Sequence, residues 1–227
     1  MQKLNRQTKA VIFDFDGTLT KERTTHSSWE KIWVELGYTP EDCRNLHEEF
    51  DKGNISHQEW CDITANKFRA KNLHHDLIEK IGDEIELMPG IEKVINDLLA
   101  SNIKLYIVSG SIKTIIEKAL GALHAHFIEV KANKFVFNEI KYLVEIIGTK
   151  YDFKGKAKYI SKVIQENNLS PDDVVFIGNS VNDNWAHLSG VKTICINPRM
   201  KDKDYKEYWS HILSDVESLY DIMYLIE

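Results

Sequence analysis

The sequence V-I-F-D-F-D-G-T-L-T at residues 11–20 carries the strongest structural signal in this chain. Its apolar residues are typical of a buried strand, and the Gly-Thr step that follows is typical of a turn. Asp14 and Asp16 stand among these apolar residues, although burying an unpaired carboxylate costs several kcal/mol. We therefore expect a ligand at the end of this strand that offsets their charge.

The composition of the whole chain is ordinary for a globular protein, with 227 residues, 43% of them hydrophobic and 28% charged. This length corresponds to one large domain or one domain with an insertion. The net charge of -6 argues against binding to nucleic acid or to an anionic membrane surface, since both need a basic face. No apolar run approaches the roughly 18 residues of a membrane-spanning helix, and we expect no signal peptide.

The cysteines at positions 43, 61 and 195 are widely spaced and lack the pattern of a metal site. We expect Cys43, Cys61 and Cys195 to be reduced thiols, as is usual in a cytoplasmic protein. Cytoplasmic localisation is therefore our expectation.

Short apolar runs alternate with helical patterns along most of the chain. The elements that we expect are strands at 9–15, 103–109, 127–130, 174–177 and 191–196, helices at 91–101, 112–120 and 156–167, and a β-hairpin at 134–147. We also expect a helix from about Asn182 and a helical C-terminal segment with apolar residues at Leu213, Val216 and Leu219. This alternation predicts an α/β fold, a Rossmann-like parallel sheet covered on both faces.

Between about residues 25 and 86 the pattern changes to amphipathic helices alone, with apolar residues spaced three and four apart. No strand signal interrupts them. We therefore predict a helical cap domain at 21–86, inserted into a core domain formed by 1–20 and 87–227. Its tryptophans could stack on a substrate ring, but their helical spacing favours the interior of the cap; they are Trp29, Trp33 and Trp60.

Polar residues follow the predicted strands where a parallel sheet binds its ligands, at the carboxyl ends. Asp14 and Asp16 are two apart, share one side of an extended chain, and could together hold a hard cation such as Mg²⁺. A pair of capping aspartates in a loop is the alternative. Ser109 ends I-K-L-Y-I-V-S and, with the N–H of Gly110, could form an anion site at a helix start, or be a plain N-cap.

Two further segments point to the same edge of the sheet. The segment G-N-S-V-N-D at 178–183 places the amide of Asn179 and the carboxylate of Asp183 there, unless it is only a helix-start turn. Lys154 and Lys156 lie where the next helix begins. Positive charge at a helix start opposes the macrodipole, but it suits an anion site.

Together these features resemble the haloacid dehalogenase (HAD) superfamily phosphatases over nearly the whole chain. Residues 13–20 match the D-x-D-G-T signature, and I-V-S-G-S at 107–111 matches the strand-ending Ser/Thr motif. Lys156 fits the family lysine, and 178–183 fits the acidic loop, normally G-D-x-x-x-D. The order and spacing of the motifs also agree with that family.

The helical insertion is similar to the cap of the phosphoserine-phosphatase-like branch, and K-A-N-K-F-V-F-N-E at 131–139 resembles its A-N-x-hydrophobic segment. The sequence departs from the family at Asn179, where an Asp is usual. Glu22 and Arg23 lie near the place of the cap glutamate of phosphoserine phosphatases, but they match it only loosely.

The resemblance implies a Mg²⁺-dependent phosphomonoester hydrolase that acts on a small phosphorylated metabolite. It implies that Asp14 attacks phosphorus and forms an aspartyl-phosphate. Asp16 would protonate the leaving oxygen and later accept a proton from water. The metal would lie among the Asp14 carboxylate, the Asp16 backbone carbonyl and Asp183, with Asn179 close by.

The resemblance also implies a phosphate site. Ser109, Gly110 and Lys156 would hold the phosphoryl oxygens, with Lys154 as the alternative lysine. Gly17 would let the backbone approach the phosphate, and Thr18 would stabilise the turn after the nucleophile.

Several functions remain open at this point. They are a phosphoserine phosphatase proper, a phosphotransferase, and a catalytically weak protein that binds a phosphate ligand, as Asn179 suggests. Carbon–halogen hydrolysis is a further possibility in the superfamily, but it does not require the carboxylate of Asp16. The sequence leaves the substrate and the oligomeric state open.

Overall fold

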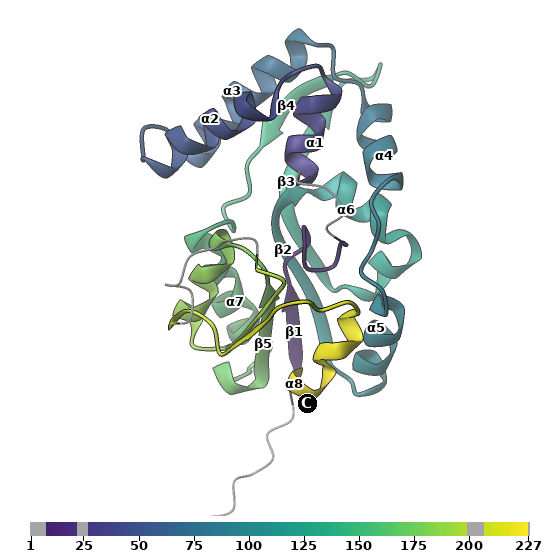
Figure 1. The fold of residues 1–227 in the computed structure, drawn as a ribbon, viewed down its shortest axis with the longest axis vertical. Coiled ribbons are helices and arrows are strands. Elements are labelled where there is room, and N and C mark those ends of the chain that lie inside the picture. Colours follow the sequence, from purple (N-terminus) through teal and green to yellow (C-terminus); the bar gives the residue numbers. More distant parts are fainter. Residues whose placement is uncertain (1–7, 22–26, 199–206, 227) are drawn as a thin grey trace, which may run out of the picture.

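The computed structural model describes residues 8–21, 27–198 and 207–226. They form one seven-stranded sheet in the order β4-β3-β2-β1-β5-β6-β7, with helices packed against it (Figure 1). The strands are β1 (Ala10–Phe13), β2 (Lys104–Ile112), β3 (Glu129–Phe137), β4 (Leu143–Ile147), β5 (Val174–Gly178), β6 (Lys192–Ile196) and β7 (His211–Leu213). All neighbouring strands are parallel except β3 and β4. The predicted α/β fold with a Rossmann-like sheet is confirmed.

The described helices lie between these strands along the chain. They are α1 (Ser28–Glu35), α2 (Pro40–Asp51), α3 (His57–Ala70), α4 (His75–Asp83), α5 (Ile91–Ala100), α6 (Lys113–Leu120), α7 (Lys154–Glu166) and α8 (Met223–Ile226). Short 3-10 helices also occur, namely η1 (Gly121–His126), η2 (Pro171–Asp173), η3 (Val181–Ser189) and η5 (Leu219–Ile222). None of the helices in the described part of the chain is long and apolar enough to cross a membrane.

Strand β1 lies in the middle of the sheet and is apolar on both sides. Val11 and Phe13 join the cluster that includes residues of α5 and α6, whereas Ala10 and Ile12 join the cluster that includes residues of α7. All four side chains are fully buried. Because β1 is covered on both faces, its sequence is a continuous apolar run instead of an alternating one.

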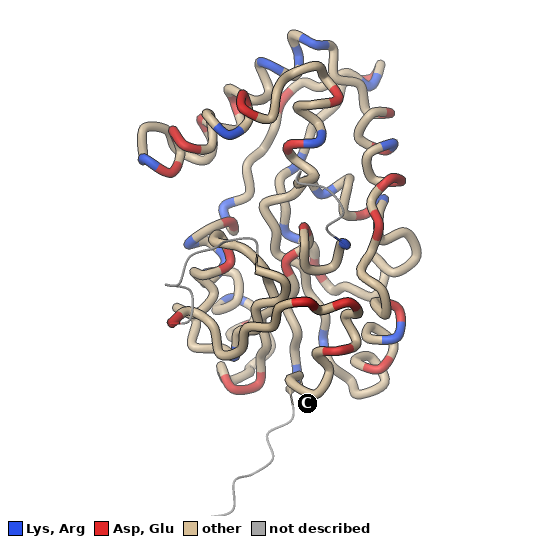
Figure 2. Tube along the Cα trace, in the orientation of Figure 1, with Lys and Arg blue, Asp and Glu red and all other residues tan. Residues whose placement is uncertain are grey.

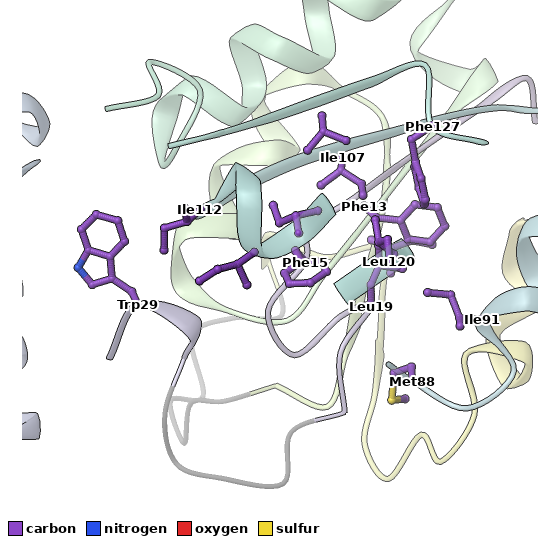
Figure 3. Close-up of a cluster of buried hydrophobic side chains, with 14 of the residues drawn as sticks. Phe13, Phe15, Leu19, Trp29, Met88, Ile91, Ile107, Ile112, Leu120 and Phe127 are labelled. Atoms are coloured by element: carbon purple, nitrogen blue, oxygen red, sulfur yellow. The ribbon is translucent and has the colours of Figure 1, made fainter. Parts of the chain in front are cut away.

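The loop after β1 is anchored in the same core. Phe15, which stands between the two aspartates, is fully buried together with Leu19, as Figure 3 shows. Phe13 contacts Phe127 edge to face, with ring centroids 6.3 Å apart. Since Phe15 faces the core, the side chains that flank it are directed to the other side of the extended chain.

Helices α1 to α4 lie together at one end of the molecule, with β4 beside them (Figure 1). Helices α1, α2 and α3 each begin with a capping box, at Ser27, Thr39 and Ser56. The predicted tryptophans form the interior of this helical module: Trp33 is fully buried, and Trp29 and Trp60 expose only 8% and 9%.

The predicted β-hairpin is present as β3 and β4, and it packs against the helical module. Leu143 N–H donates to Leu73 O at 3.0 Å. His75 N–H donates to Lys141 O at 2.9 Å, and an Arg69 guanidinium nitrogen donates to Val144 O at 2.8 Å. These bonds connect the hairpin to the helices that were predicted to form a cap at 21–86. The boundaries of that cap therefore stay a prediction.

Two sequence-based expectations about local structure are wrong, whereas the expected helix from about Asn182 is present as the 3-10 helix η3. Strand β2 runs through Ile112, beyond its expected end at Ser109. Leu213 ends strand β7 and only η5 and α8 of the C-terminal segment are helical. The backbone of Val216 forms two hydrogen bonds of 2.8 Å with the Asn197 side chain. Val216 therefore lies in a loop that Asn197 holds in place, and not in a helix.

Candidate active site

The predicted polar residues meet where β1 and β5 end and at Ser109, which lies within β2. Asp14 directly follows β1, and its N–H donates to Ile177 O of β5 at 2.8 Å. The parallel register aligns Phe13 with Ile107 of β2 and with Ile177. The residues that follow these aligned positions in the three strands therefore lie close together at one edge of the sheet.

Lys156 is the basic residue at this place. It lies in the first turn of α7, is fully buried, and its Nζ donates to Asp14 Oδ1 at 2.9 Å. The same ammonium forms an ion pair with Asp183. Lys154, the alternative, is exposed, and its Nζ lies 4.7 Å from the ring centroid of Trp185. The structure thus brings Lys156, and not Lys154, to the carboxylates.

The three buried charges do not balance. Burial and the charge of Asp183 raise the pKa of Asp14 to about 7, although Lys156 opposes this shift. Burial alone would lower the pKa of Lys156, but Asp14 and Asp183 outweigh it and hold that pKa above its ordinary value. One ammonium between two carboxylates leaves a negative excess, which is an environment that favours a further cation.

The loop after β5 fixes one of these carboxylates. Asp183 Oδ2 accepts hydrogen bonds from the backbone N–H groups of Asn179 and Ser180, both at 3.0 Å. A Cβ at Gly178 would lie 2.6 Å from Asp183 Cγ, so only glycine fits there. Asp183 is therefore held rigidly, with its Oδ1 directed at Lys156.

The Asn179 side chain is buried with its hydrogen-bonding capacity unused. It exposes only 1%, and among the described residues neither its Oδ1 nor its Nδ2 has a partner. Buried amides are nearly always hydrogen-bonded, so an unpartnered one indicates a ligand or water. An amide oxygen next to an excess of carboxylate charge suits Mg²⁺, which prefers oxygen ligands.

Gly17 and Thr18 form the turn after the aspartates. Gly17 has a φ of +76°, and a Cβ there would collide with the Asn179 amide. Its N–H donates to Thr20 Oγ1 at 2.8 Å. Thr18 is fully buried, and its hydroxyl has no partner within the described part of the chain. The turn therefore packs directly against the loop that follows β5.

Ser109 and Gly110 line the other side of the site. Ser109 exposes only 2%, and its Oγ accepts the N–H of Ser111 at 3.2 Å. Helix α6 begins after Ile112 without a side-chain cap, so the reading of Ser109 as an N-cap is wrong. Asn133 Nδ2 donates to Gly110 O at 2.6 Å and thereby fixes the backbone next to Ser109.

Asp16 is half-buried and is contacted from the helical module. Ser28 Oγ, at the start of α1, donates to Asp16 Oδ2 at 2.7 Å. Sequence reasoning missed this serine, because the contact depends on how α1 packs and not on a local pattern. Glu22 and Arg23, compared above with the cap glutamate, lie outside the described residues.

Asp152 is a further residue that the sequence did not indicate. It lies just before α7, and its Oδ1 accepts a hydrogen bond of 2.9 Å from Asn182 Nδ2. Its Oδ2 lies so close to Gly110 that a Cβ at Gly110 would collide with it. In the sequence, the only signal for Asp152 was its position just before the lysines at the start of α7. Asn133, by contrast, lies in the segment 131–139 whose resemblance to the family was noted above.

The comparisons with known proteins agree with this geometry. The family model of the haloacid dehalogenase-like hydrolases matches residues 8–186. The chain therefore belongs to the haloacid dehalogenase-like hydrolases.

Relatives narrow this assignment to the phosphoserine-phosphatase-like branch, a group of phosphatases. A phosphoserine phosphatase of Methanocaldococcus jannaschii is 22% identical over 202 residues, which are 88% of this chain and 92% of that protein. One of Archaeoglobus fulgidus is 23% identical over 179 residues, 79% of this chain but only 49% of that longer protein. The chain thus spans about half the length of the second relative.

Solved structures show the same fold. A phosphoserine phosphatase described as a phospho-aspartyl intermediate analogue has a TM-score of 0.77 at 20% identity, covering 97% of this chain and 100% of that one. A HAD family hydrolase from Salmonella enterica serovar Typhi has a TM-score of 0.80 at 15% identity, covering 98% and 72%. At these identities the likeness concerns the fold alone.

Proposed function

We propose that this phosphatase is a Mg²⁺-dependent phosphomonoester hydrolase that acts on a small phosphorylated metabolite through an aspartyl-phosphate at Asp14. The observation that carries the proposal is the buried trio of Asp14, Lys156 and Asp183, in which the Lys156 Nζ lies 2.9 Å from Asp14 Oδ1. A buried arrangement with excess negative charge is costly for stability alone, which points to a role in chemistry.

Four side chains of the site have separate roles in the proposed reaction. Asp14 attacks phosphorus while the bond from phosphorus to the leaving oxygen breaks. Asp16 gives its proton to that leaving oxygen and afterwards takes a proton from the water that hydrolyses the aspartyl-phosphate. Ser109 and Lys156 hold the phosphoryl oxygens in position.

The residues that would hold Mg²⁺ are the carboxylates of Asp14 and Asp183, the backbone carbonyl of Asp16 and the amide of Asn179. When bound, Mg²⁺ would neutralise charge on the phosphoryl group and keep Asp14 ionised. The unpartnered buried amide of Asn179 and the unbalanced carboxylates support this assignment.

A panel of phosphate esters, assayed with Mg²⁺ and with EDTA, tests the proposal. We expect phosphate release that requires Mg²⁺, and the relatives make O-phosphoserine a natural member of the panel. Release that is equal in EDTA, or no release from any ester, would contradict it. Added acceptor alcohols that divert phosphate into new esters would indicate a phosphotransferase instead.

A second candidate is a phosphate-binding protein with weak catalysis, and Asn179 favours it because the site has one carboxylate fewer than is usual in the family. If the missing charge limits metal binding, Asn179→Asp should lower the Mg²⁺ concentration for half-maximal activity by about tenfold, since added ligand charge strengthens binding of a hard cation. Saturable phosphate binding without hydrolysis, in both the wild type and this variant, would favour the second candidate.

A further inference from the structure

A pair of serine hydroxyls joins the helical module to the residue proposed as acid and base. Ser28 Oγ lies 2.7 Å from Asp16 Oδ2 and 2.6 Å from Ser111 Oγ. Both serines are nearly fully buried, at 5% and 2% exposure. Ser28 uses its single hydroxyl hydrogen on Asp16, so the hydroxyl of Ser111 must donate to Ser28.

The chain of hydrogen bonds continues to the phosphate side of the site. The Ser111 N–H donates to Ser109 Oγ at 3.2 Å. Because the Ser109 oxygen acts as acceptor here, its own hydroxyl hydrogen is directed elsewhere and can serve a phosphoryl oxygen. Asp16 and Ser109 are thus connected through two serines, one of them on the helical module.

The position of Ser28 is set by the interior of that module. Ser28 is the first residue of α1, and the next residue, Trp29, packs edge to face on Trp60 of α3 and on Phe135 of β3. Both ring centroids lie 5.8 Å from that of Trp29. The packing of Trp29 therefore fixes where the Ser28 hydroxyl meets the sheet.

We propose that Ser28 is a positioning residue for Asp16, an inference that rests on the proposed function. As the bond from phosphorus to the leaving oxygen breaks, its electron pair stays on that oxygen, which takes the proton of Asp16. Asp16 becomes a carboxylate at this moment. The Ser28 hydroxyl holds its orientation and stabilises the new negative charge by a charge-assisted hydrogen bond.

This role makes a distinct prediction about leaving groups. A poor leaving group needs the proton of Asp16, whereas p-nitrophenolate departs readily without it. We expect Ser28→Ala to lower kcat/KM for phenyl phosphate by about tenfold, the lower range for a hydrogen bond to a charged group. For p-nitrophenyl phosphate we expect a loss below about threefold, and the inhibition constant of inorganic phosphate should change less than about twofold.

Three further variants complete the experiment. Ser27→Ala is the matched control, because the Ser27 hydroxyl caps α1 by accepting the Glu30 N–H at 3.2 Å. We expect it to leave the ratio of the two esters unchanged. Ser28→Thr keeps a hydroxyl and should restore the ratio, whereas Ser111→Ala should shift it in the same direction as Ser28→Ala but less.

The ratio also protects the test against misfolding, since a smaller folded fraction lowers both rates equally. Equal losses on the two esters, or the same shift in Ser27→Ala, would overturn the role of Ser28 while leaving the proposed function intact. A wild type that hydrolyses no ester of the panel with Mg²⁺, these two included, would overturn the proposed function and this role together.

Discussion

The polar site at the ends of β1 and β5 and the interior of the helical module are built in opposite ways. At the sheet, Asp14, Lys156 and Asp183 are charged, nearly or fully buried, and paired with one another. In the module, rings such as Trp33 and Phe68 fill the interior, with centroids 5.3 Å apart. Charged residues of both signs are interspersed along α2 to α4 (Figure 2).

The difference shows which region is organised for stability and which for chemistry. Burying apolar rings stabilises a fold, whereas a buried ion pair often contributes nothing net. Substitutions at the sheet ends should therefore change activity far more than substitutions in the module. The four predictions below test this contrast, beginning with the largest expected effect.

Asp14→Asn should abolish turnover, with a loss of about four powers of ten or more, because an amide cannot replace the carboxylate nucleophile. The measurement is phosphate release from p-nitrophenyl phosphate, together with trapping of the phosphorylated protein. The thermal midpoint in EDTA serves as the control for folding. Near-normal turnover, or label trapped on another residue, would remove Asp14 from this role.

Lys156→Ala should lower kcat/KM by about 10²–10³, the usual loss when one donor to the developing charge is removed. It should also destabilise the metal-free protein, because Asp14 and Asp183 are left buried without their cation. Lys154→Ala is the matched control on the same helical turn, and we expect a change below about twofold. A larger loss in Lys154→Ala would reverse the assignment of the lysine.

The metal-free protein should lose stability as the pH rises from about 4 to 7. The raised pKa of Asp14, about 7 against 3.8, means that the folded state holds a proton which the unfolded state has released. Between pH 5 and 8 this amounts to on the order of 2–3 kcal/mol of lost unfolding free energy.

Urea unfolding in EDTA at these two pH values measures the effect, with Asp14→Asn as the reference. The variant should show a smaller fall, and saturating Mg²⁺ should suppress the fall in the wild type. Equal pH dependence in the two proteins would contradict the raised pKa.

Thr39→Ala should produce the smallest effect. Thr39 caps α2, where its Oγ1 accepts the Asp42 N–H at 3.2 Å and its own N–H donates to Asp42 Oδ2 at 2.8 Å. Losing this cap should reduce the unfolding free energy by about 1 kcal/mol. We expect kcat/KM to stay within about twofold of the wild type, and a loss comparable to that of Lys156→Ala would refute the contrast between the two regions.

Much of the sheet and of its polar edge could be predicted from the sequence. Continuous apolar runs marked the central strands, and the rule for ligand positions in parallel sheets brought together Asp14, Ser109 and Asp183. Both features follow from local patterns combined with a general property of the architecture. The capping boxes of the module are equally local signals.

Other features depended on packing between distant segments, which no local pattern records. The resemblance favoured Lys156 and left Lys154 as the alternative, and only the way α7 lies against the sheet shows which of the two is buried. The contact of Ser28 with Asp16 arises from the placement of α1 by Trp29. The helical spacing of Leu213, Val216 and Leu219 misled the prediction for the C-terminal segment, because Leu213 ends strand β7 and Val216 lies in a loop held by Asn197. Only Leu219, the first residue of η5, lies in a helix.

The contact between the β3–β4 hairpin and helices α1 to α4 has a consequence for exchanging the helical module between related proteins. Leu143 and Ile146 of β4 expose only 5% and 1% of their surface, and backbone bonds link the hairpin to the residues around Leu73 and His75. A chimera in which only the helices were exchanged would expose the side chains of Leu143 and Ile146 to mismatched neighbours. Exchange between homologues should therefore succeed only when the helices and the hairpin are exchanged together, although they are far apart in the sequence.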